Sequence, residues 1–564
     1  MSRRQFLAGA GILAAGAGAS LAGCAPKKQS DKSASSTTAA TTSGDGSTTE
    51  ENSAIWQLQE VGEPDETIQA DVAIIGAGGT GTAAAIQAVD LGLNPIVVDR
   101  LDGYGGSFVG TEGMVAFESH YEKQDVPYLS SAYYPSQPYG VKNAVNTCLN
   151  YHHWIPQHKL YDNFFGQTAE TIDWLEGHGQ KFAGVIAIGN GPKVWHVYDK
   201  NGSTTSPGGY FMQTFGEEAQ RMGVNARFKT YGRKIVMEDG KVAGVLVESD
   251  KGKVTKIEAP VVMIATGGYA NNSDFLYGVS ETKNENIQAL GMNCREGDGI
   301  KMAKDAGADM TEGLGTVMWC GPVTIGAVSA TWTIDAYTAG VQPTLWLNEK
   351  GERFCKEDLW IDDFSAAGIQ VRNQQRTFAL FTEQDMKNWE ATGPYGQCFS
   401  FGQPGTPLSQ AREQLQAASG CHVGDDLASL CEQVGLDAAA VQATVDTYNQ
   451  YCAAAAKLDG DDVSADQDFG KRAKYMHAVD AGPYWLCEIA DGYYTTCGGI
   501  KVNENAQVLD TDGNVIPGLY AGGSDAGGLY GDSYDVKFAP GSQASWAVNS
   551  GRLAMKNAAT YLGK

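Results

Sequence analysis

The alternation of apolar and polar residues changes abruptly at residue 71. Residues 72–75 form a short continuous apolar run, which predicts a strand buried on both faces, as in a parallel sheet. An alanine-rich stretch follows and predicts a helix that ends near Leu91. A second apolar run at residues 95–98 predicts another buried strand. This order of strand, helix and strand predicts an α/β fold with a largely parallel sheet.

A glycine-rich turn joins the first predicted strand to the helix. It places Gly76, Gly78, Gly79 and Gly81 in the pattern G-x-G-x-x-G, and Asp99 ends the second strand 18 residues after Gly81. Such glycines permit a tight turn and a close approach of the backbone to a pyrophosphate, while the acid accepts hydrogen bonds from a ribose. The pattern therefore predicts a Rossmann-like domain that binds a dinucleotide at a helix N-terminus. The motif by itself does not distinguish FAD from NAD.

Composition narrows the class of partner. The 564 residues carry a net charge of −25, which argues against nucleic acid or a bare anionic membrane as a binding partner. None of the 11 cysteines forms C-x-x-C, and no C-x-x-C-H sequence for haem attachment occurs. We expect the cysteines to be free buried thiols. An iron–sulfur cluster built from distant cysteines stays open.

The N-terminus has the features of an export signal. Arg3-Arg4 precedes an apolar stretch that ends at Gly23, as in a bacterial twin-arginine signal peptide. Leu21-Ala22-Gly23-Cys24 fits a lipobox, in which Cys24 receives lipid; the alternative is cleavage by an ordinary signal peptidase. Residues 24–66 then form a Ser/Thr-rich tether. We therefore expect a lipid-anchored protein on the outer face of the bacterial cytoplasmic membrane.

Further segments occur in the order found in one family. They are Gly105-Gly106-Ser107, Ala265-Thr266-Gly267-Gly268, Gly297-Asp298-Gly299, the N-x-x-G-x-R-F-x-x-E turn at 348–357, and Gly518–Gly523 with Gly551-Arg552. Together they resemble the FAD-dependent fumarate reductase and succinate dehydrogenase flavoproteins, a family with urocanate reductase-like and 3-ketosteroid dehydrogenase-like members. The resemblance spans roughly residues 71–562.

The resemblance implies FAD as cofactor and a discontinuous FAD-binding domain at 67–315 and 494–564. An inserted α+β clamp domain is expected at 316–493, with the substrate between the two over the flavin. It also implies a separate membrane electron donor, either a quinol-linked cytochrome or an FMN protein, as in anaerobic respiration. The implied FAD-binding residues are Gly76, Gly78, Gly79, Gly81, Asp99, Gly105, Gly106, Ser107, Thr266, Gly267, Gly268, Gly523, Ser524 and Ser542.

The sequence departs from the family where fumarate reductases hold a dicarboxylate. The position of the proton-donating arginine is Ile361, the H-H-T-x-G-G motif reads Tyr494–Gly499, and H-G-x-N-R reads Tyr530–Tyr534. Because two carboxylates need fixed positive charge, fumarate is not expected as substrate. The candidate catalytic residues are aromatic instead, namely Tyr534, Tyr494, Tyr530 and Tyr337, with Trp319 as a further lining residue.

Such a lining suits a flat, conjugated, mostly apolar molecule. We therefore expect a reductase of an activated C=C bond in an aromatic or enone-type substrate. Two alternatives are a dehydrogenase that desaturates a ketone or steroid-like substrate, and a flavin electron-transfer protein without turnover. No metal site is expected, and His152-His153 is expected to cap or line a surface.

Overall fold

The computed structural model describes residues 54–124, 139–188, 191–280, 286–291, 294–327, 334–396, 404–460, 462–531 and 533–564. The predicted twin-arginine signal and Cys24 lie outside these residues. Within them, no helix is both long enough and apolar enough to span a bilayer.

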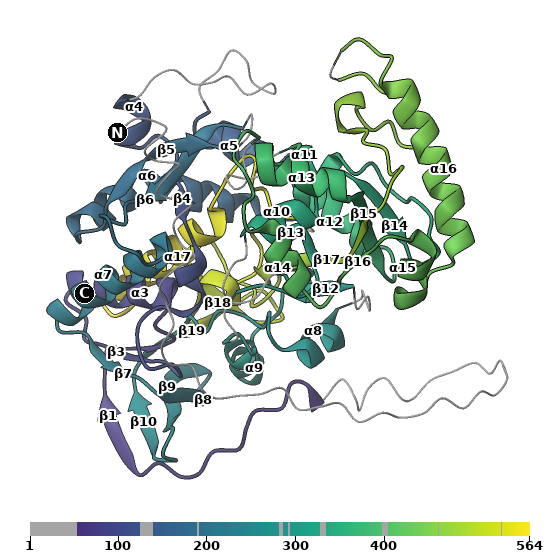
Figure 1. The fold of residues 1–564 in the computed structure, drawn as a ribbon. Coiled ribbons are helices and arrows are strands. Elements are labelled where there is room, and N and C mark those ends of the chain that lie inside the picture. Colours follow the sequence, from purple (N-terminus) through teal and green to yellow (C-terminus); the bar gives the residue numbers. More distant parts are fainter. Residues whose placement is uncertain are drawn as a thin grey trace, which may run out of the picture.

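The predicted strand–helix–strand unit lies at the centre of a six-stranded sheet (Figure 1). β2 (Val72–Ile75) and β3 (Pro95–Val98) pair in parallel and are buried along their whole length, because helices cover one face of the sheet and a second sheet packs against the other. The sheet order is β18-β19-β11-β2-β3-β7. The other strands are β7 (Asn225–Arg227), β11 (Val261–Ile264), β18 (Gln507–Leu509) and β19 (Val515–Ala521). The predicted α/β fold class is thus confirmed.

Helix α3 (Gly79–Asp90) follows β2 and packs against the long C-terminal helix α17 (Ser542–Tyr561). In Figure 1 this yellow helix lies among the purple and blue elements of the N-terminal part, so the end of the chain returns to the first sheet. Contact this close requires small residues on both helices. A Cβ at Gly551 would lie 2.4 Å from the backbone oxygen of Thr80.

Two smaller sheets extend the first domain. One has the order β1-β10-β9-β8 and the other β4-β6-β5. The first contains β1 (Glu66–Gln69), β8 (Thr230–Glu238), β9 (Lys241–Ser249) and β10 (Val254–Glu258). The second, β4 (Gly113–Val115), β5 (Phe182–Ala187) and β6 (Lys193–Tyr198), lies near α4 (His120–Gln124), α5 (Val141–Tyr151), α6 (His158–Gly177) and α7 (Pro207–Arg221).

A separate sheet forms the part of the molecule coloured green in Figure 1. Its centre is β17 (Tyr484–Thr496), which crosses the predicted domain boundary at residue 493 and ends three residues beyond it. Around it lie β12 (Ile287–Ala289), β13 (Val317–Thr324), β14 (Leu345–Asn348), β15 (Thr377–Thr382) and β16 (Cys421–Gly424). The helices of this clamp region are α10 (Ile334–Gly340), α11 (Leu359–Asp362), α12 (Phe364–Arg372), α13 (Glu383–Thr392), α14 (Ala411–Ala417), α15 (Leu427–Val434) and α16 (Ala438–Ala455).

The expectation of free thiols is wrong for two cysteines. Cys421 and Cys487 face each other across β16 and β17 and form a disulfide. They are 66 residues apart in sequence, so only the strand pairing brings them together. The free cysteines of the described chain are Cys148, Cys294, Cys355, Cys431, Cys452 and Cys497, of which all but Cys294 are buried.

Candidate functional site

The glycine-rich turn has the geometry that the motif predicts. Gly78 precedes α3, and its added Cβ would meet nothing nearer than the Gly105 oxygen at 3.6 Å, so space remains in front of the turn. Gly76 has a φ of +110°, and a Cβ there would lie 2.1 Å from the oxygen of Ala265. Only glycine therefore fits at residue 76, and the N-terminus of α3 is free to face an anionic group.

Asp99 holds this turn against the end of β3. One carboxylate oxygen accepts the N–H of Ala77 at 2.6 Å, and the other accepts the N–H of Leu101 at 2.7 Å. Burial raises the pKa of Asp99, while these backbone donors lower it. Each oxygen keeps further acceptor capacity, which is what a ribose hydroxyl requires.

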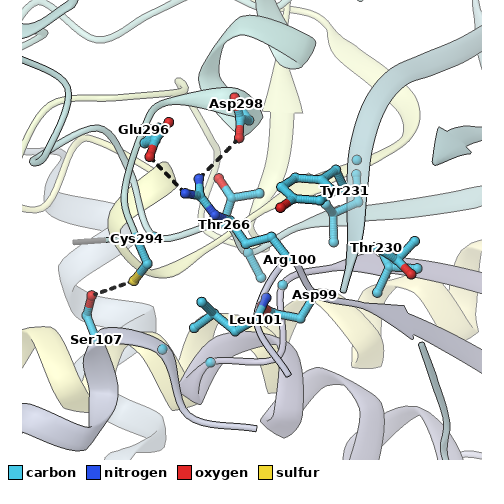
Figure 2. A pocket seen from close by; sticks show the side chains of 18 of the residues that line it. Asp99, Arg100, Leu101, Ser107, Thr230, Tyr231, Thr266, Cys294, Glu296 and Asp298 are labelled. Atoms are coloured by element: carbon cyan, nitrogen blue, oxygen red, sulfur yellow. Dashed lines mark hydrogen bonds and ion pairs between the residues drawn. The ribbon is translucent and has the colours of Figure 1, made fainter. Parts of the chain in front are cut away.

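A cavity opens beside the turn (Figure 2). Arg100 crosses it and pairs with Glu296 at 2.8 Å and with Asp298 at 3.7 Å. Ser107 lies 3.7 Å from the sulfur of Cys294 on the other side. The predicted residues Gly76, Gly78, Asp99, Gly106, Ser107, Thr266 and Gly267 all line this space. A glycine turn, a helix N-terminus and a ribose acceptor in one cavity fit the adenosine diphosphate half of FAD.

The A-T-G-G turn is held by a residue that the sequence analysis missed. Asp525 is fully buried, and its carboxylate accepts the Thr266 hydroxyl at 2.8 Å and the N–H groups of Gly267 and Gly268 at 2.9 and 3.2 Å. Burial raises the pKa of Asp525, and these three donors lower it. Asp525 therefore joins the turn to the C-terminal motif, a contact that no local pattern reveals.

The three C-terminal residues predicted to bind FAD lie along the first half of α17. Gly523 donates its N–H to Ser550, while Ser524 accepts from Gln543 at 2.8 Å. Ser542 is fully buried, and its hydroxyl donates to Asp535 at 3.0 Å. The roles of these residues in binding FAD remain predictions.

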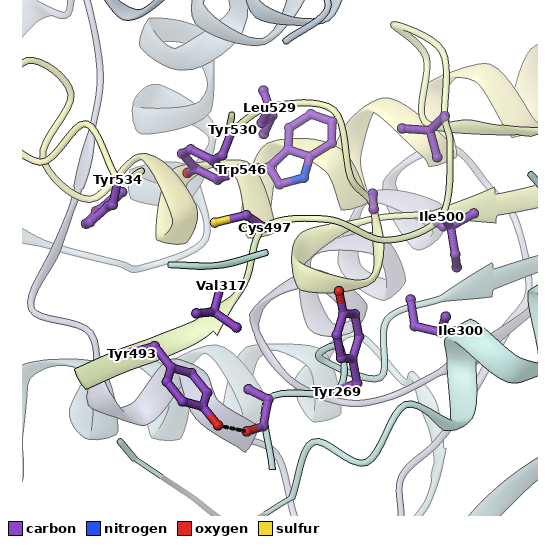
Figure 3. Packing of buried hydrophobic residues seen from close by; sticks show 14 of the residues in the cluster. Tyr269, Ile300, Val317, Tyr493, Cys497, Ile500, Leu529, Tyr530, Tyr534 and Trp546 are labelled. Carbon is purple, nitrogen blue, oxygen red and sulfur yellow. Dashed lines mark hydrogen bonds between the residues drawn. The ribbon is translucent and has the colours of Figure 1, made fainter. Parts of the chain in front are cut away.

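Tyr530 and Tyr534 lie together in the buried core near the start of α17 (Figure 3). Their rings are 6.0 Å apart and edge to face. The Tyr530 hydroxyl lies 2.8 Å from that of Ser542. Since the Ser542 proton points to Asp535, Tyr530 donates to Ser542.

The Tyr534 hydroxyl is a hydrogen-bond acceptor, whereas that of Tyr530 is a donor. Its hydroxyl oxygen accepts the N–H of Gly541 at 3.0 Å. A phenol that accepts an N–H keeps its own proton for donation. Burial raises the pKa of Tyr534, and the carboxylate of Asp535 raises it further, so the phenol stays protonated at neutral pH.

Tyr494 and Tyr337 come from the clamp region. Tyr494 is half-buried on β17, and its carbonyl accepts a hydrogen bond from Arg295. Tyr337 lies on α10 and is buried in the same core. The side chain of Trp319 lies outside the described part of the structure.

Arg295 is a second residue that the motif analysis missed. It is 1% exposed, and it donates to Asn271 Oδ1 and to the Leu290 oxygen, both at 2.7 Å, besides Tyr494. These three acceptors are all neutral. Burial lowers the pKa of Arg295. Arg295 therefore ties β17 to the segment after the A-T-G-G turn.

The expectation that His152-His153 lines a surface is wrong for His152. This side chain is fully buried, and its Nε2 lies 3.3 Å from the carboxylate of Asp535. Asp535 also accepts the Tyr161 hydroxyl at 3.2 Å. His152 directly follows α5 as its C-cap, and its imidazole packs against the rings of Tyr151, Tyr161 and Tyr530.

The R-F-x-x-E turn forms a buried charge network in the clamp. Arg353 makes two hydrogen bonds of 2.7 Å to Glu357 and an ion pair of 2.8 Å with Asp466. Lys471 is fully buried beside them, 3.5 Å from Glu357. Ile361 follows this network and packs against the core, so no ionisable group stands at that position.

One surface group brings metal-binding residue types together. His120 contacts Asp173 at 2.9 Å and Glu176 at 3.4 Å, and the Tyr121 hydroxyl donates to Glu176. These mutual contacts already use the atoms that would bind an ion. The prediction that the chain has no metal site is not tested by this group.

Comparisons with known proteins agree with this geometry. Residues 71–535 match the family model described as an FAD binding domain. The chain is 29% identical over 502 residues to the vinyl phenol reductase of Lactiplantibacillus plantarum, covering 87% of this chain and 96% of that protein.

Solved structures show the same fold. The open conformation of a flavocytochrome c3 fumarate reductase superposes with a TM-score of 0.66 at 25% identity, covering 88% of this chain and 79% of that one. A 3-ketosteroid-Δ4-(5α)-dehydrogenase from Rhodococcus jostii has a TM-score of 0.63 at 20% identity, covering 88% and 98%. This second likeness is one of fold alone.

Proposed function

Because the chain belongs to the FAD-binding domain family, whose relatives include fumarate and vinyl phenol reductases, we propose that it reduces the C=C bond of a phenolic aryl alkene. The family, the cofactor FAD and the class of FAD-dependent oxidoreductase acting on C=C bonds agree with the resemblance seen in the sequence. The observation that carries the substrate proposal is the pair of buried tyrosines, Tyr530 and Tyr534 (Figure 3). They occur in a chain that is similar over 87% of its length to a vinyl phenol reductase.

The residues that would hold FAD are the glycine turn before α3, Asp99 and the A-T-G-G turn. FAD, when bound, supplies a hydride for one carbon of the alkene. The protein must then hold the substrate, exclude water and deliver one proton to the neighbouring carbon.

Tyr534 is the proposed proton donor. Its hydroxyl accepts from Gly541 and so keeps its own proton, and burial together with Asp535 keeps the phenol protonated. Tyr530 has the supporting role, because its proton is already given to Ser542. Tyr494 is proposed to contact the substrate from the clamp side, with its backbone held by Arg295.

Fumarate is not the proposed substrate. A dicarboxylate is best held by pairs of arginines with free N–H groups. Arg295 already gives hydrogen bonds to three neutral acceptors, and the family's arginine positions are occupied by Ile361 and Tyr534. An uncharged aromatic substrate needs no such charge.

We further propose that the protein is exported through the twin-arginine route and anchored by lipid at Cys24. A reductase outside the cytoplasm has no soluble NADH supply, so a membrane redox protein is the proposed electron donor. Export of the folded protein suits an enzyme that takes up its cofactor in the cytoplasm.

The test is an anaerobic assay of the holoenzyme with a reduced viologen as donor. We expect turnover of 4-vinylphenol to 4-ethylphenol, identified by mass, and no turnover of fumarate. Reduction of the oxidised enzyme by a saturated ketone would indicate the reverse, desaturating activity. Neither reaction would occur in a pure electron-transfer protein.

A further inference from the structure

A tyrosine–aspartate pair joins the two halves of the molecule. Tyr151, the last residue of α5, donates its hydroxyl to both carboxylate oxygens of Asp363, at 3.2 and 3.0 Å. Helix α5 belongs to the FAD-binding part, whereas Asp363 stands between α11 and α12 of the clamp. Because the two residues come from different parts, the pair lies at the interface between them, and both side chains are half-buried there.

The pair lies beside the candidate catalytic loop. Burial raises the pKa of Tyr151, Asp363 raises it further, and a hydrogen bond from Ser533 lowers it. Ser533 directly precedes Tyr534. From the clamp side, the Ser365 hydroxyl donates to the Tyr534 carbonyl at 3.4 Å. Tyr151 and Asp363 are therefore neighbours of the proposed proton donor on both sides of the interface.

Capping of α12 uses only one oxygen of the Asp363 carboxylate. Asp363 caps α12, because its Oδ1 accepts the N–H of Ala366 at 3.0 Å. Within the described part of the chain, its Oδ2 accepts only the Tyr151 hydroxyl. A carboxylate has about four acceptor sites, so this oxygen can take a further donor. The Tyr151 oxygen has two lone pairs, and the hydrogen bond from Ser533 uses one of them.

The proposed substrate class needs such an acceptor. A vinyl group on a neutral benzene ring is not polarised to accept hydride. A para hydroxyl changes this when it loses its proton, because its electron pair then moves through the ring to the alkene. The terminal carbon becomes basic, and the carbon next to the ring becomes electron-poor once that proton is added.

We propose that Tyr151 binds the phenolic hydroxyl of the substrate and that Asp363 accepts its proton through Tyr151; this rests on the proposed function. The substrate O–H breaks, and its proton passes to the Tyr151 oxygen as the Tyr151 proton moves to Asp363. The terminal alkene carbon takes a proton from Tyr534. The resulting quinone methide accepts a hydride at the carbon next to the ring, which restores the aromatic phenolate.

The balance closes with the return of the first proton. The product phenolate regains it from Asp363 through Tyr151, and Tyr534 is reprotonated from water. The substrate thus gains one hydride and one proton, and two electrons leave the donor. Tyr151 is the group that contacts the substrate, and Asp363 acts through it as a positioning residue.

The test measures binding of two product analogues to oxidised holoenzyme by the change in flavin absorbance. 4-Ethylphenol has the hydroxyl, and 4-ethylanisole replaces it with a methyl ether. We expect the wild type to prefer the phenol by about 10–100-fold, the worth of a hydrogen bond to a charged pair. Asp363→Asn and Tyr151→Phe should bring this preference to within about threefold.

These substitutions and their controls separate recognition from folding. Asparagine is also a good N-cap, so Asp363→Asn keeps the cap of α12. Tyr451→Phe removes the hydroxyl of another tyrosine–aspartate pair. Tyr451 lies on α16 and donates its hydroxyl to Asp468 at 3.1 Å. Asp426→Asn changes the cap of α15 in the same way. Both controls should keep the full preference for the phenol.

The outcomes distinguish this inference from the proposed function. If the wild type reduces 4-vinylphenol and 4-methoxystyrene equally well, or if both variants keep the preference, the role of Tyr151 and Asp363 is wrong and the aryl alkene reductase stands. If the wild type reduces no aryl alkene, the proposed function fails and this inference fails with it. Equal losses for both analogues in the variants would show a structural role only.

Discussion

Replacement of Asp525 by alanine is expected to disrupt the flavin site, although Asp525 itself has no contact with solvent. The carboxylate is 0% exposed and accepts three hydrogen bonds, from Thr266, Gly267 and Gly268. A buried donor left without a partner costs about 1–3 kcal/mol, and the cost is smaller for the half-buried Thr266 and Gly267 than for the buried Gly268. Burial opposes the charged form and raises the Asp525 pKa, which offsets part of this loss. Summed over three donors, the penalty would be about 3–9 kcal/mol, and we expect a destabilisation of about 3–6 kcal/mol, in the lower half of this range.

The assay is urea unfolding of the apoprotein, together with the ratio of flavin to protein after purification. Asp525→Ala should lower both the unfolding midpoint and the flavin content, because the A-T-G-G turn loses its anchor. The control is Asp510→Asn, since Asp510 accepts two backbone N–H groups in an exposed turn. Its cost should stay within about 1 kcal/mol. If Asp525→Ala bound FAD fully and unfolded within 1 kcal/mol of the wild type, this reading of the turn would be wrong.

Four further predictions follow from single residues. Tyr534→Phe should keep FAD but slow turnover by about 10²–10⁴-fold, the usual worth of a positioned acid, and unchanged turnover would exclude it as proton donor. Gly78→Val should fold but be purified without flavin, because the new side chain would enter the open space in front of the turn, where the pyrophosphate would lie. A yellow variant would contradict this. Burial lowers the pKa of His196 to about 4, so stability should fall by about 3 kcal/mol between pH 6.5 and 4, and this slope should disappear in a His196→Gln variant. Cys24→Ala should release the protein from the membrane fraction, and membrane retention would rule out the lipid anchor.

The sign of the His196 effect follows from its contacts. Nδ1 lies 3.0 Å from the Val194 carbonyl, and Nε2 lies 2.7 Å from the Ser119 hydroxyl, in a fully buried site. Largely through burial, the folded state binds its proton only near pH 4, whereas the unfolded state binds one near pH 6.5. Stability from this group is therefore complete above pH 6.5 and is lost as the pH falls to 4.

The sequence predicts those features that depend on neighbouring residues. The strand at 72–75, the glycine turn and Asp99 lie within one unit of the chain, and the backbone geometry at Gly76 follows from the motif. The order of the later motifs also predicts the family and its cofactor, because each is a short turn with its own signature.

The contacts that no local pattern could reveal join distant segments. Asp525 lies more than 250 residues after the A-T-G-G turn that it holds, and Tyr151 lies 212 residues before Asp363. At His152 the prediction from the sequence was wrong. It was expected at the surface, but it directly follows α5 and lies in the core beside Asp535. Pairing of Cys421 with Cys487 likewise depends on the register of two strands.

The central claim is that reduced flavin in this protein transfers its electrons to a phenolic alkene. The most direct measurement is anaerobic stopped-flow mixing of the reduced holoenzyme with 4-vinylphenol, followed through the return of the oxidised flavin absorbance. We predict rapid reoxidation with formation of one 4-ethylphenol per flavin, and no reoxidation by fumarate under the same conditions. Flavin that stays reduced with 4-vinylphenol, or that is reoxidised by fumarate at a comparable rate, would contradict this account.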